Sequence, residues 1–277
     1  MSNNLTYKYR VNESTLYECS TCGFIQVDEK PSEAELSAVY SNLYFDNNKY
    51  TDDLNQYKEN RRRLSFINRY LRPESGNKPK LLDFGCASGD FIQAAKPIYE
   101  IWGHDFSDYA IEKARHLNPD IADHFSSGSY EKIDFPHEFF DGMVIWDVIE
   151  HLWDPLTVCR RLLLYLKPGG FLFISTPSIG SLTASLTRRY WIFMTPPEHL
   201  AFFSTKSISF LLQNQLNCRI MKIKNQGKSV NMGFFFYKLK RIFPRLIPHF
   251  YDTKLIRTMR IYIPTGDIMY VAAIKPE

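Results

Sequence analysis

The stretch Leu81–Phe91, LLDFGCASGDF, decides the fold of this chain. A short apolar strand runs into an acid, then into a turn bounded by Gly85 and Gly89, and a helix start follows at once. Glycine at such a turn lets the backbone approach a ligand that a Cβ atom would block. The turn lacks both the glycine spacing of the dinucleotide fingerprint and the Gly-Lys-Ser/Thr of a phosphate loop. Neither absence counts against a ligand site if the ligand carries no phosphate.

Two further acids stand at the ends of predicted strands. Asp105 follows a strand over 99–104, about twenty residues beyond Gly85, where an acid can accept both hydroxyls of a ribose. Ser107 is then the predicted N-cap of a helix over 108–117, and capping is the alternative role of Asp105. Asp147 closes a third apolar strand over 140–146.

The middle of the chain alternates strands with helices. Asp154 and Pro155 predict a helix start, with the helix running to about residue 166. Lys167–Gly170 ends it, and the next buried strand is predicted over 171–175. This alternation of strands and helices indicates a parallel sheet with helices on both faces. In such sheets, ligands bind at the carboxyl ends of the strands. The acids at 83, 105 and 147 all lie at that edge.

Four segments, LLDFGCASGDF, GHDFSDYAIEKAR, FDGMVIWDVIEHLWDP and LKPGGFLFISTP, together resemble the class I S-adenosylmethionine-dependent methyltransferases in order and spacing. The resemblance is close over residues 80–177. It implies an α/β, Rossmann-like fold with a mainly parallel seven-stranded sheet, closed by antiparallel strands near 219–224 and 267–274. It also implies a helical N-terminal lid and helical insertions.

The resemblance assigns S-adenosylmethionine contacts residue by residue. Asp83 and the backbone of the turn would hold the methionine end of the cofactor, and Asp105 the ribose. Phe106 would lie against the adenine, and Trp146 and Asp147 would close the site over the sulfonium. The full set of cofactor-binding candidates is Asp83, Gly85, Cys86, Ala87, Ser88, Gly89, Asp105, Phe106, Gly128, Ser129, Trp146 and Asp147.

Composition narrows the possibilities. The chain has 277 residues, 44% of them hydrophobic, and a formal net charge of only +4, without the concentrated basic face that nucleic-acid binding needs. No apolar run is long enough to span a membrane and the N-terminus has no signal-peptide core, so we expect a cytoplasmic protein. Its five cysteines indicate reduced thiols rather than a disulfide framework.

Residues 1–75 are predicted to form an extension before the methyltransferase domain at 76–277, which carries insertions around 178–203 and 226–262. Cys19 and Cys22 form half of a zinc ribbon whose second half is missing, so a knuckle packed on the domain is favoured over a zinc site. Helices are expected over 31–40 and 52–71. Tyr44, Tyr50 or an arginine of the run 61–63 are candidates to reach the cofactor, although a charge run is usually a solvated face.

Two histidines are candidate general bases. His151 follows the strand that ends at Asp147, and His199 lies in a Pro-Glu-His-Leu-x-x-Phe-Ser segment that resembles one in enzymes acting on sugars and glycolipids. Each follows a glutamate, Glu150 or Glu198, and His199 with Glu198 is preferred over His151. As an alternative, Asp147, Glu150 and His151 resemble the divalent-metal cluster of quinone-biosynthesis O-methyltransferases, although metal is the minor expectation.

The sequence thus predicts O-methylation of a sugar, glycan or glycolipid acceptor in surface-polysaccharide or natural-product biosynthesis. The alternatives are a quinone- or phenol-type O-methyltransferase and an inactive cofactor-binding scaffold. The missing glycines exclude an NAD-dependent dehydrogenase. The basic, aromatic stretch 234–260 suits either a peripheral contact with the inner face of an anionic membrane or a cap over the acceptor pocket.

Overall fold

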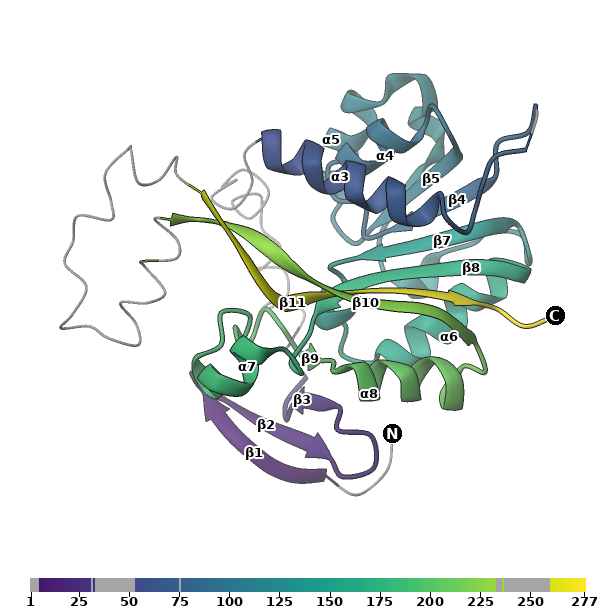
Figure 1. Cartoon of the computed structure of the whole chain (residues 1–277). Coiled ribbons are helices and arrows are strands. Elements are labelled where there is room, and N and C mark those ends of the chain that lie inside the picture. Colours follow the sequence, from purple (N-terminus) through teal and green to yellow (C-terminus); the bar gives the residue numbers. More distant parts are fainter. Residues whose placement is uncertain (1–4, 31, 33–52, 75, 233–235, 237–259) are drawn as a thin grey trace.

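The computed structural model describes residues 5–30, 32, 53–74, 76–232, 236 and 260–277. Its centre is a seven-stranded sheet in the order β10-β11-β8-β7-β4-β5-β6 (Figure 1). The strands β4 to β8 pair in parallel, and β11 pairs antiparallel with both β8 and β10. The bounds are β4 (Lys80–Phe84), β5 (Glu100–Asp105), β6 (Phe125–Ser127), β7 (Phe140–Trp146), β8 (Leu166–Pro177), β10 (Arg219–Asn231) and β11 (Arg260–Ile274). The predicted mainly parallel sheet with closing antiparallel strands is confirmed.

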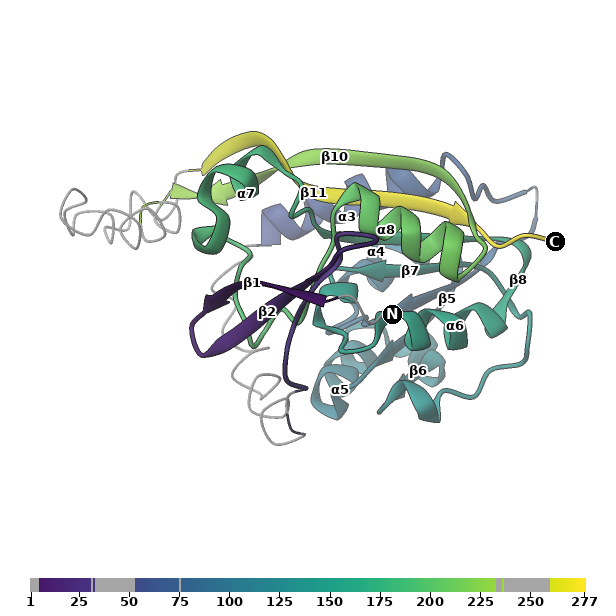
Figure 2. The ribbon, with the colours of Figure 1, turned by 90° about the horizontal axis from the view of Figure 1, so that it is seen from below.

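Helices cover both faces of this sheet (Figures 1 and 2). One hydrophobic cluster joins the sheet to α3 (Asp53–Ile67), α4 (Asp90–Ala95) and α5 (Asp108–Leu117). A second cluster on the opposite face joins it to α6 (Pro155–Tyr165) and to α8 (Thr205–Ser209), which continues as the π-helical η5 (Phe210–Gln215). Short 3₁₀ turns complete the domain: η1 (Pro119–His124), η2 (Tyr130–Lys132) and η3 (Ile149–His151).

The predicted helix starts follow the capping rules. Ser107 accepts a hydrogen bond from the backbone N–H of Ala110, and Asp154 accepts one from Thr157. The helix expected over 52–71 ends earlier, at Ile67. Tyr57 of this helix is 59% exposed.

The N-terminal extension contains a β-sheet that the sequence did not predict. The strands β1 (Leu5–Val11), β2 (Ser14–Cys19) and β3 (Ile25–Val27) form a sheet that ends on β9 (Ala201–Phe202). β3 pairs with a strand from the insertion around 178–203, far away in the sequence. That insertion also carries α7 (Leu182–Thr187) and η4 (Arg188–Tyr190). The three-residue β3 and the two-residue β9 are too short for a sequence pattern to predict them, because their stability comes from pairing with a distant partner.

The cysteine knuckle packs against the domain. The Gly23 N–H donates to the Cys19 carbonyl, and both Cys19 and Cys22 are 2% exposed in the cluster that includes α6 and α8. Phe24, directly after the knuckle, lies 5.1 Å from the Phe203 ring. Burial raises the pKa of the Cys22 thiol, which keeps it protonated and suits a packing role.

Several predictions fall outside the described residues: the helix at 31–40, Tyr44, Tyr50, and most of the stretch 234–260. Within the part of the chain that the structure does describe, no helix is both long and apolar enough to cross a bilayer.

Candidate cofactor and acceptor site

A cavity of about 510 Å³ opens at the carboxyl ends of the parallel strands. Four of the predicted cofactor residues, Asp83, Cys86, Ser88 and Gly89, do not line it; the Cys86 side chain is buried in the core cluster under the turn. Eight do line it: Gly85, Ala87, Asp105, Phe106, Gly128, Ser129, Trp146 and Asp147. The tertiary structure therefore gathers ends of β4, β5 and β7 and the loop after β6 around one space.

The two glycines of the turn are required by protein packing. Gly85 and Gly89 have φ values of +80° and +79°, which side chains rarely adopt. A Cβ atom on Gly85 would come within 2.3 Å of a Val148 methyl carbon, and one on Gly89 within 3.2 Å of the Ala114 Cα atom. The sequence analysis attributed these glycines to approach of a ligand. The structure shows that they allow the turn to pack closely against Val148 and Ala114.

Asp105 ties the end of β5 to the turn. Its carboxylate accepts hydrogen bonds from the backbone N–H groups of Ala87 and Ser107, both at 2.9 Å. Burial raises the pKa of Asp105 although these backbone donors work in the opposite direction. Phe106, the next residue, is 54% exposed at the rim of the cavity.

A half-buried arginine of α3 faces the strand ends. The guanidinium of Arg63 lies 2.5 Å from the carboxylate of Asp147 and 5.4 Å from the centre of the Trp146 ring. Asp83 is 2% exposed, and burial raises its pKa to about 7 while the charge of Arg63 lowers it. Arg63 is thus the cation that partly offsets the acids at this edge.

Sequence reasoning left the arginine run 61–63 open and did not single out Arg63. Asn60 and Ile67 are buried, and Arg63 lies on the same inward face of α3, a face that helical periodicity identifies only once the packing of the helix is known. Arg61 and Arg62 fall outside that face and are exposed.

The predicted metal cluster of Asp147, Glu150 and His151 is wrong in its geometry. Asp147 has a φ of +55° and accepts a hydrogen bond from Ser175 as well as pairing with Arg63, and η3 begins only at Ile149. No helix therefore places Asp147 beside the other two. Glu150 is buried and accepts a hydrogen bond from the Thr176 hydroxyl at 3.0 Å. The ligand atoms of Glu150, His151 and His199 lie within 4.8 Å of one another, so these three could reach one cation.

The rings of the two candidate bases pack edge to face, with their centres 4.8 Å apart. Only one of the two rings lines the cavity. His151 lines it, and its Nδ1 donates to the Glu198 carbonyl at 2.8 Å. His199 is 8% exposed and is not part of the cavity wall; its Nδ1 donates to the Phe193 carbonyl at 2.8 Å. Glu198 thus contributes a main-chain oxygen that orients His151.

His104 holds the loop after β6 in place. Since the Gly128 carbonyl can only accept, the His104 Nε2 donates to it at 3.0 Å, and Nδ1 accepts from the Ser126 hydroxyl at 2.9 Å. Burial lowers the pKa of His104 to about 4, so the ring is neutral at physiological pH. His104 thereby positions Gly128 on the cavity wall.

A seven-stranded sheet closed by an antiparallel pair, with acids at the ends of its central parallel strands, defines the class I S-adenosylmethionine-dependent methyltransferase fold. The chain belongs to the methyltransferase-domain family, whose model matches residues 54–220, more than half of the chain.

Known proteins agree with this placement. A ubiquinone biosynthesis O-methyltransferase of Haemophilus ducreyi is 30% identical over 105 residues, which cover 35% of this chain and 44% of that protein. This chain therefore spans less than half the length of that curated relative. An S-adenosylmethionine-dependent methyltransferase from Archaeoglobus fulgidus superposes with a TM-score of 0.55 at 14% identity, covering 85% of this chain and 100% of that one. The [4+2]-cyclase SpnF does so with a TM-score of 0.58 at 16% identity, covering 91% and 98%.

Proposed function

We propose that this protein transfers the methyl group of S-adenosylmethionine to a hydroxyl oxygen of its acceptor, with His151 as the general base. The observation that carries the proposal is that His151 lines the same cavity as Asp105 and the turn after β4. The fold alone is insufficient, because SpnF has the same fold and is described as a cyclase.

The residues at the strand ends fit the cofactor. Asp105 presents a carboxylate for a ribose diol, and Phe106 offers an exposed ring beside it. The Nε1 donor of Trp146, on the cavity wall, is buried and has no hydrogen-bond partner among the described residues. Arg63 supplies a positive charge for an α-carboxylate near Asp83. When bound, the cofactor supplies the methyl electrophile and the leaving group.

His151 has the protonation state that a base needs. Because Nδ1 donates to the Glu198 carbonyl, the proton of the neutral ring is on Nδ1 and the lone pair is on Nε2. Burial lowers the pKa of His151, although the Glu198 carbonyl and the charges of Glu198 and Asp147 raise it. The ring is therefore neutral at pH 7 and can accept the hydroxyl proton as the oxygen attacks.

The test compares His151→Asn with His199→Asn. We expect His151→Asn to lower turnover by about a hundredfold or more, with unchanged affinity for S-adenosylhomocysteine by calorimetry. His199→Asn should lower turnover less, because the His199 ring contacts His151 but does not line the cavity. In the wild type, kcat should stay constant above pH 6.5 and fall only at lower pH. Full activity of His151→Asn would contradict the assignment.

For the acceptor, we propose a sugar, glycan or glycolipid hydroxyl, supported by the resemblance of residues 197–204 to a segment of enzymes that act on sugars and glycolipids. These residues come next to the cavity, since Leu200 lines it and its N–H donates to the Glu150 carbonyl at 2.8 Å. Surface-polysaccharide or natural-product assembly would be the setting.

A phenol or quinol is the second candidate acceptor. The described wall beside His151 is largely apolar, formed by Val148, Leu152, Trp153, Val158 and Leu200, and the matched Haemophilus ducreyi relative is a ubiquinone biosynthesis O-methyltransferase. Methyl transfer from isotopically labelled cofactor to matched panels of sugar and catechol acceptors separates the two. Cofactor binding without transfer to any acceptor would favour an inactive scaffold.

Cytoplasmic residence, with peripheral membrane contact through residues 234–260, is also a proposal. It is supported by the basic and aromatic composition of that stretch. Co-sedimentation with anionic vesicles tests it.

A further inference from the structure

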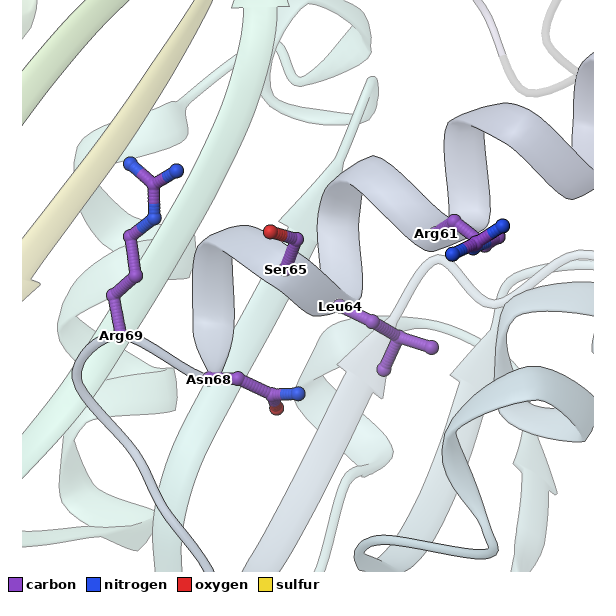
Figure 3. A pocket seen from close by; sticks show the side chains of 5 residues that line it. All are labelled: Arg61, Leu64, Ser65, Asn68 and Arg69. Carbon is purple, nitrogen blue, oxygen red and sulfur yellow. The ribbon is translucent and has the colours of Figure 1, made fainter.

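A second cavity, here called the arginine groove, lies between α3 and β10. Its volume is about 420 Å³, and four cations line it: Arg61, Arg62, Arg69 and Lys224. An adjoining hollow of about 390 Å³ shares Arg61, Ser65 and Arg69 with it. Figure 3 shows these three side chains in order along α3 and the segment that follows it. Two neighbouring hollows are thus lined by the same basic face.

The cations of the groove come together by tertiary structure. Arg61, Ser65 and Arg69 follow at four-residue intervals, which places them on one side of the helix and its last turn. Lys224 comes from β10, more than 150 residues later in the chain. A charge run on one helix is usually a solvated face, but convergence of two distant elements on one hollow is not explained by helical periodicity.

In the part of the chain that the structure describes, three of the four cations of the groove have no acid as a partner. No carboxylate lines the groove, and within the described residues no ion pair joins Arg61, Arg69 or Lys224 to an acid. Arg62 pairs with Glu59 at 3.4 Å, and the other oxygen of that carboxylate accepts a hydrogen bond from the Tyr270 hydroxyl. The base of the groove is apolar and buried, formed by the rings of Phe66 and Tyr270.

We propose that the arginine groove binds a phosphate-bearing ligand, either a free phosphomonoester or diphosphate or the headgroup of an anionic lipid. Guanidinium groups match phosphate oxygens with paired, charge-assisted hydrogen bonds. A phosphate group carries nearly two negative charges near neutral pH and so offsets several cations at once. This site goes beyond the proposed methyl transfer, whose cofactor sits at a turn without phosphate-loop residues.

The groove and the cofactor cavity can be tested separately. They share no lining residue, and the link between them is the Tyr270 ring, 5.6 Å from the ring of Trp146 on the cavity wall. Substitution of the exposed Arg61 and Arg69 therefore leaves the cofactor contacts in place.

The experiment is calorimetric titration of the full chain with inorganic pyrophosphate in about 0.1 M salt, where long-range attraction is screened. The test variant is Arg61→Gln/Arg69→Gln. The control is Arg160→Gln/Lys206→Gln, which changes the charge equally on exposed residues of α6 and α8, on the opposite face of the sheet. We expect the test variant to weaken pyrophosphate binding at least about tenfold and the control to leave it unchanged. Affinity for S-adenosylhomocysteine should be unchanged in both.

A second arm identifies the source of the phosphate. Phosphatidylcholine vesicles with and without phosphatidic acid are co-sedimented with the same proteins. Loss of phosphatidic-acid-dependent binding in the test variant alone supports a lipid headgroup, whereas pyrophosphate binding without vesicle binding supports a free ligand. No binding of either probe, or equal weakening in test and control variants, would overturn the proposal.

Discussion

Buried carboxylates at two places in this protein behave in opposite ways. At the cofactor edge, burial raises the pKa values of Asp83 and Asp105. At the junction of β11 with the insertion around 178–203, Asp267 is also buried, at 7% exposure, yet its pKa is lowered. Burial opposes ionisation at both places, so the difference lies in what surrounds each carboxylate.

Asp267 is surrounded by donors from its own chain. Its carboxylate accepts hydrogen bonds from the Ser181 hydroxyl at 2.7 Å, from the Trp191 indole at 3.1 Å, and from the hydroxyls of Thr183 and Thr265. These donors outweigh the burial of the charge. No hydrogen bond lowers the pKa of Asp83: burial and the charge of Asp105 raise this pKa, and the charge of Arg63 lowers it. A carboxylate whose oxygens accept hydrogen bonds from the protein itself stabilises the fold. A buried carboxylate without such donors is available to a ligand.

The largest effect is expected from Asp267→Ala. The substitution leaves four donors without their acceptor, of which those of Ser181 and Trp191 are buried, each at roughly 1–3 kcal/mol, and should lower the free energy of unfolding by about 3–5 kcal/mol. Denaturant melts measure the loss. Affinity of the folded protein for S-adenosylhomocysteine should not change. An Asp267→Ala protein as stable as the wild type but with impaired cofactor binding would contradict a structural role for Asp267.

Asp105→Ala should mainly affect cofactor binding. We expect cofactor affinity to fall more than tenfold, since hydrogen bonds from a ribose to a charged group are worth about 1.5–3 kcal/mol. Calorimetry with S-adenosylhomocysteine measures this, and the matched control is Asp108→Ala at the start of α5. Unchanged binding in the Asp105 variant would remove its ribose role.

Asp83→Asn should stabilise the protein while weakening the cofactor site. The pKa of Asp83 is about 7 in the folded chain against 3.8 in the unfolded one, so the unfolded chain ionises first and stability is lost as pH rises from about 4 to 7. The variant escapes this loss, by up to about 4 kcal/mol at pH 8, and should match the wild type near pH 3. Melts at both pH values measure it; a variant less stable than wild type at pH 8 would show that Asp83 is needed for the fold.

The smallest effect is the acid response of Asp267. Because its pKa is below the unfolded value of 3.8, its contribution to stability is present above about pH 4 and is lost as the pH falls through the folded pKa. Wild type should therefore lose more unfolding free energy between pH 4 and pH 2 than Asp267→Asn. Parallel curves for the two proteins would contradict this.

Part of the site could be predicted because its signals are local. The acid after each strand, the glycines at positive φ and the caps at Ser107 and Asp154 depend on residues within a few positions of one another. His199 was preferred as base for its motif, yet His151 lines the cavity. The choice between them depends on how the Glu198 and Phe193 carbonyls orient the two rings, which no local pattern encodes.

The sequence by itself determined the class of fold and the edge of the sheet where the cofactor residues gather, because strand ends and helix starts follow from nearby residues. Only the tertiary structure decided that Arg63 faces the acids while Arg61 and Arg62 line a separate groove. It alone paired β3 with β9 and saturated Asp267 with donors from residues 181 to 265. These contacts join residues far apart in the chain, and their energy arises from burial and charge in the folded state, so short-range patterns do not show them.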